Sequence, residues 1–314
     1  MSYESTAPET RSVVITGASR GLGLATAIHL HGQGWHVIAA MRTPEPAIER
    51  IRAATGAAAD DPRLAAVRLD LSDPASIEAA AAAILEVTPS PFGLVHNAGI
   101  VSVGCVEELP PQTFEDIFTT NVFGANRLTA ALLPSMRAAG RGRVVVISSE
   151  GAIHGMPAIS AYSASKGALE RWAEALVMEV APYGIGVSVL VTGTFKTDIL
   201  DEDHTVNFGD PDGPYRFLHA GQARLGDQMQ RIARSPARFG PAVARALDER
   251  ATFTRRAVGP DAVAMRIGRA LLPARPFQRM VSMVLGVPRP GALRHDRIRL
   301  ARPQPRATTT DPAG

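Results

Sequence analysis

The stretch Ser149-Glu-Gly-Ala-Ile-His-Gly-Met-Pro-Ala-Ile-Ser-Ala-Tyr-Ser-Ala-Ser-Lys166 decides the fold of this chain. The β-branched run before it, Val144 to Ile147, predicts a buried strand. The residues after it, Ala168 to Val180, carry apolar side chains at helical spacing and predict a helix. Ser149 is therefore expected at the end of a strand. Tyr162 and Lys166 are four residues apart, which places their side chains on one face of a helix.

The pairing of a phenol with an ammonium has a chemical use. A free phenol titrates near pH ~10, and a cation held beside it lowers that pKa. A tyrosine tuned in this way can give a proton to a carbonyl oxygen or take one from an alcohol, while Ser149 holds the same oxygen by a hydrogen bond. A Tyr-x-x-x-Lys spacing also arises by accident. Against that, Lys166 and Lys196 are the only lysines among many arginines, which indicates a need for a compact charge that arginine does not supply.

Composition bounds the class of protein. The chain has 314 residues, of which 46% are hydrophobic and 20% charged, as in an ordinary globular protein. No apolar run reaches about 18 residues, so no membrane-spanning helix is predicted. The polar start, Met1 to Arg11, lacks the apolar core of a signal peptide. Cys105 is the only cysteine, which excludes an internal disulfide and fits a reducing compartment. We therefore expect a cytoplasmic protein.

Charge is unevenly distributed along the chain. From Arg231 to the end there are 17 arginines against 5 acidic residues, while the whole chain carries +3. This basic part lacks interleaved aromatic residues and any nucleic-acid motif, so we predict no nucleic-acid partner. The histidines show no metal-ligand spacing, and no metal is predicted. His154 either faces the substrate or is a loop histidine without a chemical role, and Cys105 is expected to be a small buried apolar side chain.

A second motif lies near the start of the chain. Ser12 to Thr16 predicts a short buried strand, the glycine-rich turn Gly17 to Gly23 follows it, and Leu24 to His31 predicts a helix. A strand, a glycine turn and a helix in this order form a cradle for phosphate. Glycine lets the backbone approach the ligand, and the helix N-terminus presents N–H groups to it.

Strand and helix patterns alternate through the first two thirds of the chain. Further strands are expected at 35–41, 64–69, 93–96, 144–148 and 185–191, and further helices at 46–54, 75–87, 112–136 and 168–180. This alternation predicts an α/β fold, a doubly wound parallel sheet with helices on both faces. Ligands of such sheets lie outside the carboxyl ends of the strands. The residues that follow strand ends are therefore expected to line one crevice: Gly17, Asp70, Asn97, Ser149 and Gly193.

The alternation stops after Gly193. Residues 194–230 are rich in Asp, Gly and Pro and predict a long loop with little structure, which we interpret as a lid over the substrate pocket. A helix at 241–249 and a last strand at 255–258 complete a single domain over residues 12–260. Two helices form a helical extension over residues 261–288. Residues 1–11 and 289–314 are expected to be disordered.

The extension 261–288 carries many apolar residues between arginines, too many for a solvated tail. They must pack against the protein's own substrate crevice, another subunit or a membrane surface. Pro273, Pro276 and Pro288 interrupt a continuous interfacial helix, so we expect packing on the protein itself, with contact to a membrane surface as the less favoured alternative. A bulky apolar substrate, such as a steroid, polyketide or retinoid-like molecule, would suit the methionines here and three aromatic residues nearby: Phe195, Tyr215 and Phe217.

Together these motifs make the chain resemble a classical short-chain dehydrogenase/reductase over roughly Ser12 to Ile199. Within that family, the region from Val106 to Ile199 is most similar to the branch of 17-beta-hydroxysteroid and retinol dehydrogenases. The resemblance implies a Rossmann fold and an oxidoreductase that interconverts a ketone or aldehyde and an alcohol. A catalytically inactive nucleotide-sensing or interaction protein is the alternative, although such a protein need not keep Tyr162 and Lys166 at this spacing. The motifs that carry the resemblance are Thr16-Gly-Ala-Ser-Arg-Gly-Leu-Gly23, Asn97-Ala-Gly99 and the set Asn121, Ser149, Tyr162 and Lys166.

The resemblance also implies roles for single residues. Tyr162 would be the acid/base, Ser149 would position the substrate oxygen, and Asn121 would support a proton-relay water. Lys166 would bind the nicotinamide ribose and lower the pKa of Tyr162. His96 and Thr192 depart from the family pattern, which usually has Asn and Pro there. We expect a homo-oligomer, a dimer or a tetramer. The expected cofactor contacts are Gly17, Ser19, Arg20, Gly21, Leu22, Gly23, Arg42, Asp70, Leu71, Asn97, Ala98, Gly99, Tyr162, Lys166, Gly193 and Thr197.

The second strand indicates which nicotinamide cofactor is used. NAD sites place an acidic side chain on the ribose about 20 residues past the glycines. Here the second strand ends Ala39-Ala-Met-Arg42, without an acid. Arg42 and Arg20 suit the 2′-phosphate of NADP(H), which arginine grips by paired hydrogen bonds; otherwise both are solvated surface side chains. The sequence therefore predicts NADP(H).

Overall fold

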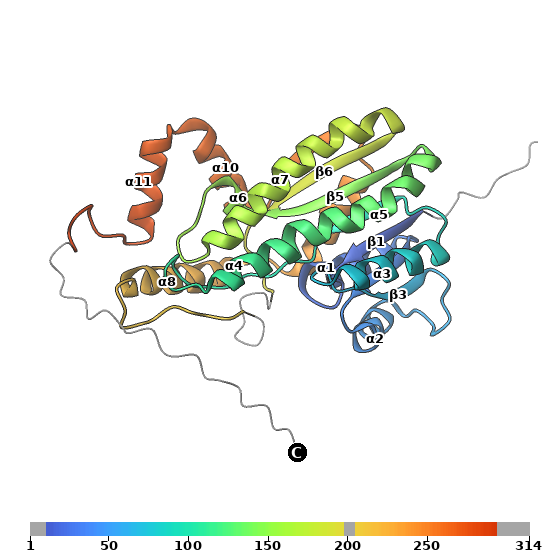
Figure 1. Ribbon diagram of the computed structural model, residues 1–314, viewed down its shortest axis with the longest axis horizontal. Coiled ribbons are helices and arrows are strands. Elements are labelled where there is room, and N and C mark those ends of the chain that lie inside the picture. The colour runs from blue at the N-terminus through green and yellow to red at the C-terminus, as the bar shows by residue number, and fades with distance from the viewer. Residues whose placement is uncertain (1–10, 198–204, 294–314) are drawn as a thin grey trace, which may run out of the picture.

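The computed structural model describes residues 11–197 and 205–293. Within them the strands form one sheet in the order β3-β2-β1-β4-β5-β6-β7, and every pairing is parallel (Figure 1). The predicted doubly wound parallel sheet is thereby confirmed. The expectations for residues 1–10 and 294–314 lie outside the described residues. The strands are β1 (Ser12–Thr16), β2 (His36–Met41), β3 (Leu64–Arg68), β4 (Gly93–His96), β5 (Gly142–Ser149), β6 (Ile185–Thr192) and β7 (Phe253–Val258).

Helices cover both faces of the sheet because its buried strands are apolar on both sides. Val13 and Ile15 of β1 belong to the core cluster beneath α1, α2 and α9, whereas Val14 belongs to the cluster beneath α3, α5 and α7. Figure 1 shows α5 and α7 lying across β5 and β6. The covering helices are α1 (Gly21–Gly32), α2 (Pro44–Thr55), α3 (Pro74–Val87), α5 (Gly124–Ala139), α7 (Ser160–Val180) and α9 (Gly240–Leu247).

The strand order reverses next to β1. The chain runs outward from β1 to β2 and β3, and then returns to place β4 on the other side of β1. A crevice opens at the carboxyl ends of the strands at such a switch point. Gly17, after β1, and Asn97, after β4, both lie there.

The predicted helix at 112–136 contains an irregular turn. It begins as α4 (Pro111–Phe118), continues as one π-helical turn η1 (Thr119–Phe123), and resumes as α5. Asn121 sits inside this turn and is buried. Single π turns inside α-helices often mark functional sites.

The expectation that residues 194–230 form a loop with little structure is wrong for their second half. Helix α8 spans Arg216–Ile232. Its buried Gly221 lies so close to the carbonyl oxygen of Leu285 that an added Cβ would overlap it. The apolar partner of α8 is therefore α11 (Ala274–Val284), far along the sequence, and the local Asp, Gly and Pro content of the segment gave no sign of it.

The extension forms two helices, α10 (Pro260–Leu271) and α11, close to the predicted bounds. Phe277, Val281 and Leu285 are buried against Leu225 of α8 and residues of the extension itself. Figure 1 shows α10 and α11 at the edge of the molecule, beside α6 (Glu150–Ile153) and the start of α7. Among residues 11–197 and 205–293, no helix has the length and apolar character needed to cross a bilayer. The remaining short helices are η2 (Ala181–Tyr183) and η4 (Pro236–Arg238).

Candidate active site

Ser149 and Tyr162 meet at the carboxyl end of β5. Ser149 is the last residue of that strand, and its Oγ accepts a hydrogen bond of 3.2 Å from the backbone N–H of Gly151, which caps α6. The Ser149 hydroxyl lies close enough to the Tyr162 phenol to lower the pKa of that phenol. The strand and the helix α7 thus bring together a hydroxyl and a phenol that can hold the same substrate oxygen.

Lys166 lies one helical turn after Tyr162 and is almost fully buried. Its Nζ donates a hydrogen bond of 2.9 Å to the carbonyl oxygen of Ile147 and lies 5.8 Å from the centroid of the Tyr162 ring. Burial lowers the pKa of Lys166 to about 8, although the nearby Glu170 carboxylate raises it. Lys166 therefore changes its charge near neutral pH, as a group involved in proton transfer needs to do.

The pKa of Tyr162 is raised above its usual value, which differs from the sequence expectation. Burial is the largest cause, the Ser149 hydrogen bond lowers the pKa in part, and the Glu150 carboxylate raises it. Burial disfavours the phenolate because the anion loses its hydration. In this structure the Lys166 ammonium is directed to a backbone carbonyl, so it does not offset the burial of Tyr162.

The side chain of Asn121 is fixed by three hydrogen bonds. Its Oδ1 accepts from the backbone N–H of Ile100 at 2.8 Å, and its Nδ2 donates to the carbonyl of Ile100 and to Ser165 Oγ, each at 3.0 Å. A Cβ added to Gly99 would lie 3.3 Å from Asn121 Oδ1 and 3.4 Å from Lys166 Nζ. The glycine thus allows η1, α7 and the end of β4 to converge.

The glycine turn has the close backbone approaches that a phosphate cradle requires. Gly17 and Gly21 have φ of +67° and +54°, in the left-handed region that favours glycine. A Cβ on Gly23 would overlap the carbonyl oxygen of Gly17. Asn97 Nδ2 donates to the carbonyls of Thr16 at 2.9 Å and Gly17 at 3.2 Å, which fixes the turn from the neighbouring strand. The N-terminus of α1 follows at once, so these residues fit a dinucleotide pyrophosphate.

Arginines surround this turn and the end of β2. Arg42 is exposed, Arg20 is half-buried, and Arg50 donates to the carbonyl of Ser19 at 3.3 Å. Arg50 was missed by sequence reasoning, since nothing in its helix pattern points at the turn. Burial raises the pKa of Asp70, but hydrogen bonds from Ser72 and the charges of Arg42 and Arg68 outweigh it, so the net shift is downward.

The other expected cofactor contacts are spread around the crevice. Leu71 is buried, and its backbone carbonyl would overlap a Cβ on Gly124. Leu22 packs partly into the core beneath α1. Thr197 donates its N–H to the carbonyl of Phe195 at 2.8 Å. Ala98 donates its N–H to Thr16 Oγ1 at 3.0 Å.

A buried carboxylate near Lys166 was also missed. Glu170, on the next turn of α7, is 2% exposed. It accepts a hydrogen bond of 2.6 Å from Ser148 Oγ and forms an ion pair with Arg255 of β7. Burial raises the pKa of Glu170, while Ser148 and Arg255 oppose that shift. The sequence shows only a helical Glu, because Arg255 comes from the last strand.

Two acidic residues, Glu150 and Asp261, lie where the extension meets the site. Burial and, to a smaller extent, the charge of Asp261 together raise the pKa of Glu150 to about 7. Asp261, at the start of α10, accepts hydrogen bonds from the backbone N–H of Thr194 and of its own neighbour Ala262. An added Cβ on Gly193 would overlap the Asp261 carboxylate. The extension is thereby fixed against the end of β6.

Both departures from the family pattern have local explanations. His96 is buried, with Nε2 2.7 Å from Thr129 Oγ1, and burial lowers its pKa to about 3. It is thus a packed, neutral strand-end side chain. Thr192 donates to the carbonyl of Ser148 at 2.7 Å and so ties β6 to β5.

Phe195 and His154 were both considered as side chains that face the substrate. Phe195 was expected near the substrate, but it is buried in the core with its ring centroid 5.5 Å from that of Phe239. That expectation is wrong, because the chain turns inward after β6. His154 stands edge-on to Phe277 of α11, with ring centroids 5.1 Å apart. Its contact is with the extension.

Cys105 is buried, and burial together with Glu108 raises the pKa of its thiol to about 12, so it is a thiol and not a thiolate. Glu108 also meets His219 of α8, with His219 Nε2 2.9 Å from both carboxylate oxygens. The donor atoms of these three residues lie within 4.8 Å of one another. The pair Glu108–His219 links α8 to the segment after β4, which sequence reasoning did not foresee.

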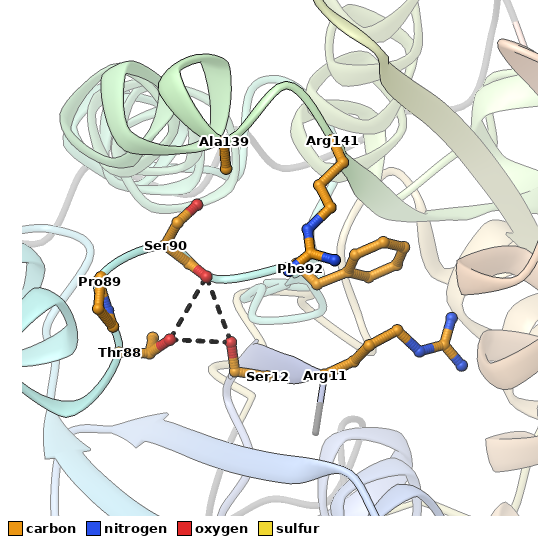
Figure 2. Close-up of a pocket in the computed structure, with 8 residues that line it drawn as sticks. All are labelled: Arg11, Ser12, Thr88, Pro89, Ser90, Phe92, Ala139 and Arg141. Atoms are coloured by element: carbon orange, nitrogen blue, oxygen red, sulfur yellow. Dashed lines mark hydrogen bonds between the residues drawn. The ribbon is translucent and has the colours of Figure 1, made fainter. Parts of the chain in front are cut away.

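A cavity of about 260 Å³ lies at the amino ends of the strands, on the opposite side of the sheet from the candidate active site. Figure 2 shows its lining, in which Ser12, the first residue of β1, and Thr88 approach each other at 3.1 Å and face the carbonyl of Ser90. Ser12 and Ser90 lie at or before the amino ends of strands, whereas Ser149 and Gly17 lie at the carboxyl ends. The cavity is thus remote from the crevice where ligands of parallel sheets bind.

The sequence comparison agrees with this geometry. The family model described as short chain dehydrogenase matches residues 11–206. The chain belongs to this family. It is therefore a dehydrogenase or reductase that acts on CH–OH groups with a nicotinamide cofactor and a small-molecule substrate, as the sequence predicted.

Several members of the short-chain dehydrogenase family resemble the chain closely. The oxidoreductase YbbO of Escherichia coli K12 is 38% identical over 194 residues, covering 61% of this chain and 68% of that protein. The 11-beta-hydroxysteroid dehydrogenase type 2 of Oryctolagus cuniculus is 37% identical over 193 residues, covering 60% of this chain and 46% of that protein. A short-chain dehydrogenase structure from Streptomyces avermitilis has a TM-score of 0.75 and 34% identity, covering 90% of this chain and all of that chain.

Proposed function

We propose that this short-chain dehydrogenase is an NADP(H)-dependent carbonyl reductase or alcohol dehydrogenase for a bulky apolar substrate, with Tyr162 as its acid/base. The observation that carries the proposal is the convergence of Ser149, Tyr162, Lys166 and Asn121 at the carboxyl end of the sheet. When bound, the nicotinamide cofactor supplies or accepts the hydride equivalent. The protein's own residues supply orientation and the proton.

The proton chemistry follows from the geometry. In reduction, Ser149 and Tyr162 both donate hydrogen bonds to the carbonyl oxygen of the substrate. This oxygen then lies within reach of the proton of the Tyr162 phenol. Tyr162 gives that proton to the oxygen. A phenol whose pKa burial has raised stays protonated at neutral pH, so it is ready to act as the donor. Lys166 then returns a proton to the Tyr162 phenolate, and Asn121, fixed by Ile100 and Ser165, would hold the water that links Lys166 to solvent.

The choice of NADP(H) rests on charge at the end of β2. Met41 is followed by Arg42, and no acidic side chain stands at that strand end. Arg42 and Arg20, with Arg50 anchored at Ser19, would grip a 2′-phosphate, to which arginine binds more strongly than to a hydroxyl. We propose contact of the cofactor with the glycine turn, Asp70, the Asn97-Ala98-Gly99 turn, Gly193 and Thr197.

The proposed substrate class rests on what borders Ser149. The segment between α6 and α7 is covered by α8 and α11, since Gln222 donates to the carbonyl of Pro157 and His154 contacts Phe277. We propose that residues 12–260 form the dehydrogenase domain and that α8 with the extension 261–288 forms its substrate cover. The similarity to an 11-beta-hydroxysteroid dehydrogenase supports a large apolar alcohol or ketone.

Steady-state kinetics test the proposal. Purified protein is given NADPH or NADH with a steroid ketone and with a small ketone such as acetone. We expect the highest kcat/KM for NADPH with the steroid ketone. A higher kcat/KM with NADH, or with acetone, would contradict the cofactor or the substrate part respectively, and no turnover with any carbonyl compound would contradict the activity.

A further inference from the structure

We propose that α10 and α11 form a docking face for an anionic lipid surface. The proposal concerns six exposed apolar residues of the two helices, called here the extension face. They are Val263, Ile267 and Leu271 of α10, and Met280, Met283 and Val284 of α11.

The extension face is apolar and exposed. Leu271 is 76% exposed and Met283 74%. On α10 the three residues are four positions apart, so they share one stripe of the helix. On α11, Met280 and Met283 with Val284 are neighbours on the helix surface, and Met283 and Val284 also border a groove formed with residues of α8. All six side chains are more than a third exposed in the part of the chain that the structure describes.

Other residues of the same helices are already buried against the enzyme. Phe277, Val281 and Leu285 are buried against α8, and Asp261 is bonded to Thr194. The extension face is therefore not a core surface waiting to fold onto its own domain. A firmly anchored pair of helices presents it outward, and Figure 1 shows these helices at the edge of the molecule.

The positive charge around the extension face favours an anionic lipid surface over a second copy of the chain as its partner. Between 260 and 293 the basic residues are Arg266, Arg269, Arg275, Arg279 and Arg289, all exposed, and the only acidic one is Asp261, which is turned inward. A twofold contact between two copies would place these arginines against the same arginines, without acids to pair them. An anionic lipid surface instead complements them while its acyl boundary accepts the apolar stripes.

Docking in this way has a consequence for the active site. Phe277 of α11 touches His154, five residues after Ser149, and α10 begins at the Asp261 that contacts Thr194. The segment covering the candidate active site is thus the one that would meet the lipid. An apolar substrate dissolved in a bilayer would reach Ser149 and Tyr162 from that side. This consequence rests on the proposed function, but the docking itself does not.

The test is co-sedimentation of the full chain with vesicles. We expect binding to vesicles of phosphatidylglycerol and phosphatidylcholine in equal parts, little binding to pure phosphatidylcholine, and release at ~1 M salt, where the Debye length is ~3 Å. The variant Ile267→Gln/Leu271→Gln/Met283→Gln removes apolar contact without changing charge. It is expected to bind more than about tenfold more weakly, because the acyl boundary would otherwise bury these three apolar side chains.

Controls separate the extension face from other causes. Met178→Gln changes a methionine of α7 that is also 74% exposed, and it should leave binding unchanged. Equal vesicle binding by the triple variant would overturn the proposal, since it would assign binding to charge elsewhere in the chain. A second result would also overturn the proposal. If the parent protein is a homo-oligomer that binds no vesicles, and the triple variant is dissociated in sedimentation velocity, the extension face is a subunit contact. Parent protein that binds the vesicles but turns over no ketone would contradict the proposed function alone, and parent protein that turns over a ketone but binds no vesicles would contradict the docking alone.

Discussion

The ammonium of Lys166 donates a hydrogen bond of 2.9 Å to the carbonyl oxygen of Ile147, two residues before Ser149. This contact ties helix α7 to the strand that ends in Ser149, so the three side chains proposed for catalysis are held by one strand and one helix. Directly behind Lys166, Glu170 joins Ser148 of the same strand to Arg255 of β7. The lysine therefore lies between the proposed reaction centre and a buried ionic network.

Glu170 is a positioning residue whose effect should appear in a pH profile. The carboxylate raises the pKa of Lys166, which burial lowers to about 8. In Glu170→Gln, which keeps an acceptor for Ser148, Lys166 should lose its proton at lower pH. The decline of kcat/KM on the alkaline side is then expected to begin at lower pH than in the parent protein.

Glu174→Gln is the matched control, because Glu174 lies one turn further along α7 and pairs only with the surface residue Arg171 among the described contacts. Its alkaline limb should stay in place. A Glu170→Gln protein whose kcat/KM falls equally at every pH would show a purely structural role for Glu170.

Arg42 should decide the choice between the two nicotinamide cofactors. Arg42→Asp is expected to lower kcat/KM with NADPH by about ten- to a hundredfold, since a charge-assisted hydrogen bond contributes roughly 1.5–3 kcal/mol. The efficiency with NADH should stay level or rise. Arg127→Asp, an exposed arginine on α5, makes the same charge change away from the turn. An unaltered NADPH-to-NADH ratio in Arg42→Asp would remove the basis for the 2′-phosphate contact.

Local rules made much of this site predictable. The Tyr162–Lys166 spacing, the glycines after β1 and the strand ends each follow from a few neighbouring residues, and the parallel topology then brings them to one edge. Glu170 with Arg255, and α8 with α11, were not predictable in the same way. Each depends on a contact between segments distant in sequence, where residue type alone does not reveal the partner. The prediction for Phe195 was wrong for the same reason, because an aromatic residue after β6 is as compatible with the core as with the substrate pocket.

The contact between α8 and α11 should be sensitive to one methyl group. Gly221→Ala would push against the carbonyl of Leu285, and overpacking of this kind costs about 1–3 kcal/mol. We expect a lower thermal midpoint and faster proteolytic cleavage of the extension. Gly226→Ala, on the same helix with open space around it, should be neutral or stabilising by up to about 1 kcal/mol. Identical behaviour of the two variants would argue against this packing.

Glu150 should make stability depend on pH. Its pKa is raised from 4.5 to about 7 in the folded protein, first by burial and then by Asp261. Between these values the folded state holds a proton that the unfolded chain has released, so stability falls as pH rises through that window. The thermal midpoint of the parent protein is expected to drop between pH 5 and pH 7.5 by more than that of Glu150→Gln. Parallel curves for the two proteins would show that Glu150 does not titrate there.

The acid/base role of Tyr162 is tested most directly by single-turnover reduction of a steroid ketone by the Tyr162→Phe variant with NADPH. The substitution removes only the hydroxyl, so folding and cofactor binding should match the parent protein, and Tyr183→Phe, an exposed tyrosine, should react normally. We predict a rate at least about 10²–10⁴-fold lower in Tyr162→Phe, the range that general acid catalysis contributes. A rate within a few-fold of the parent protein, with NADPH still bound, would contradict the account.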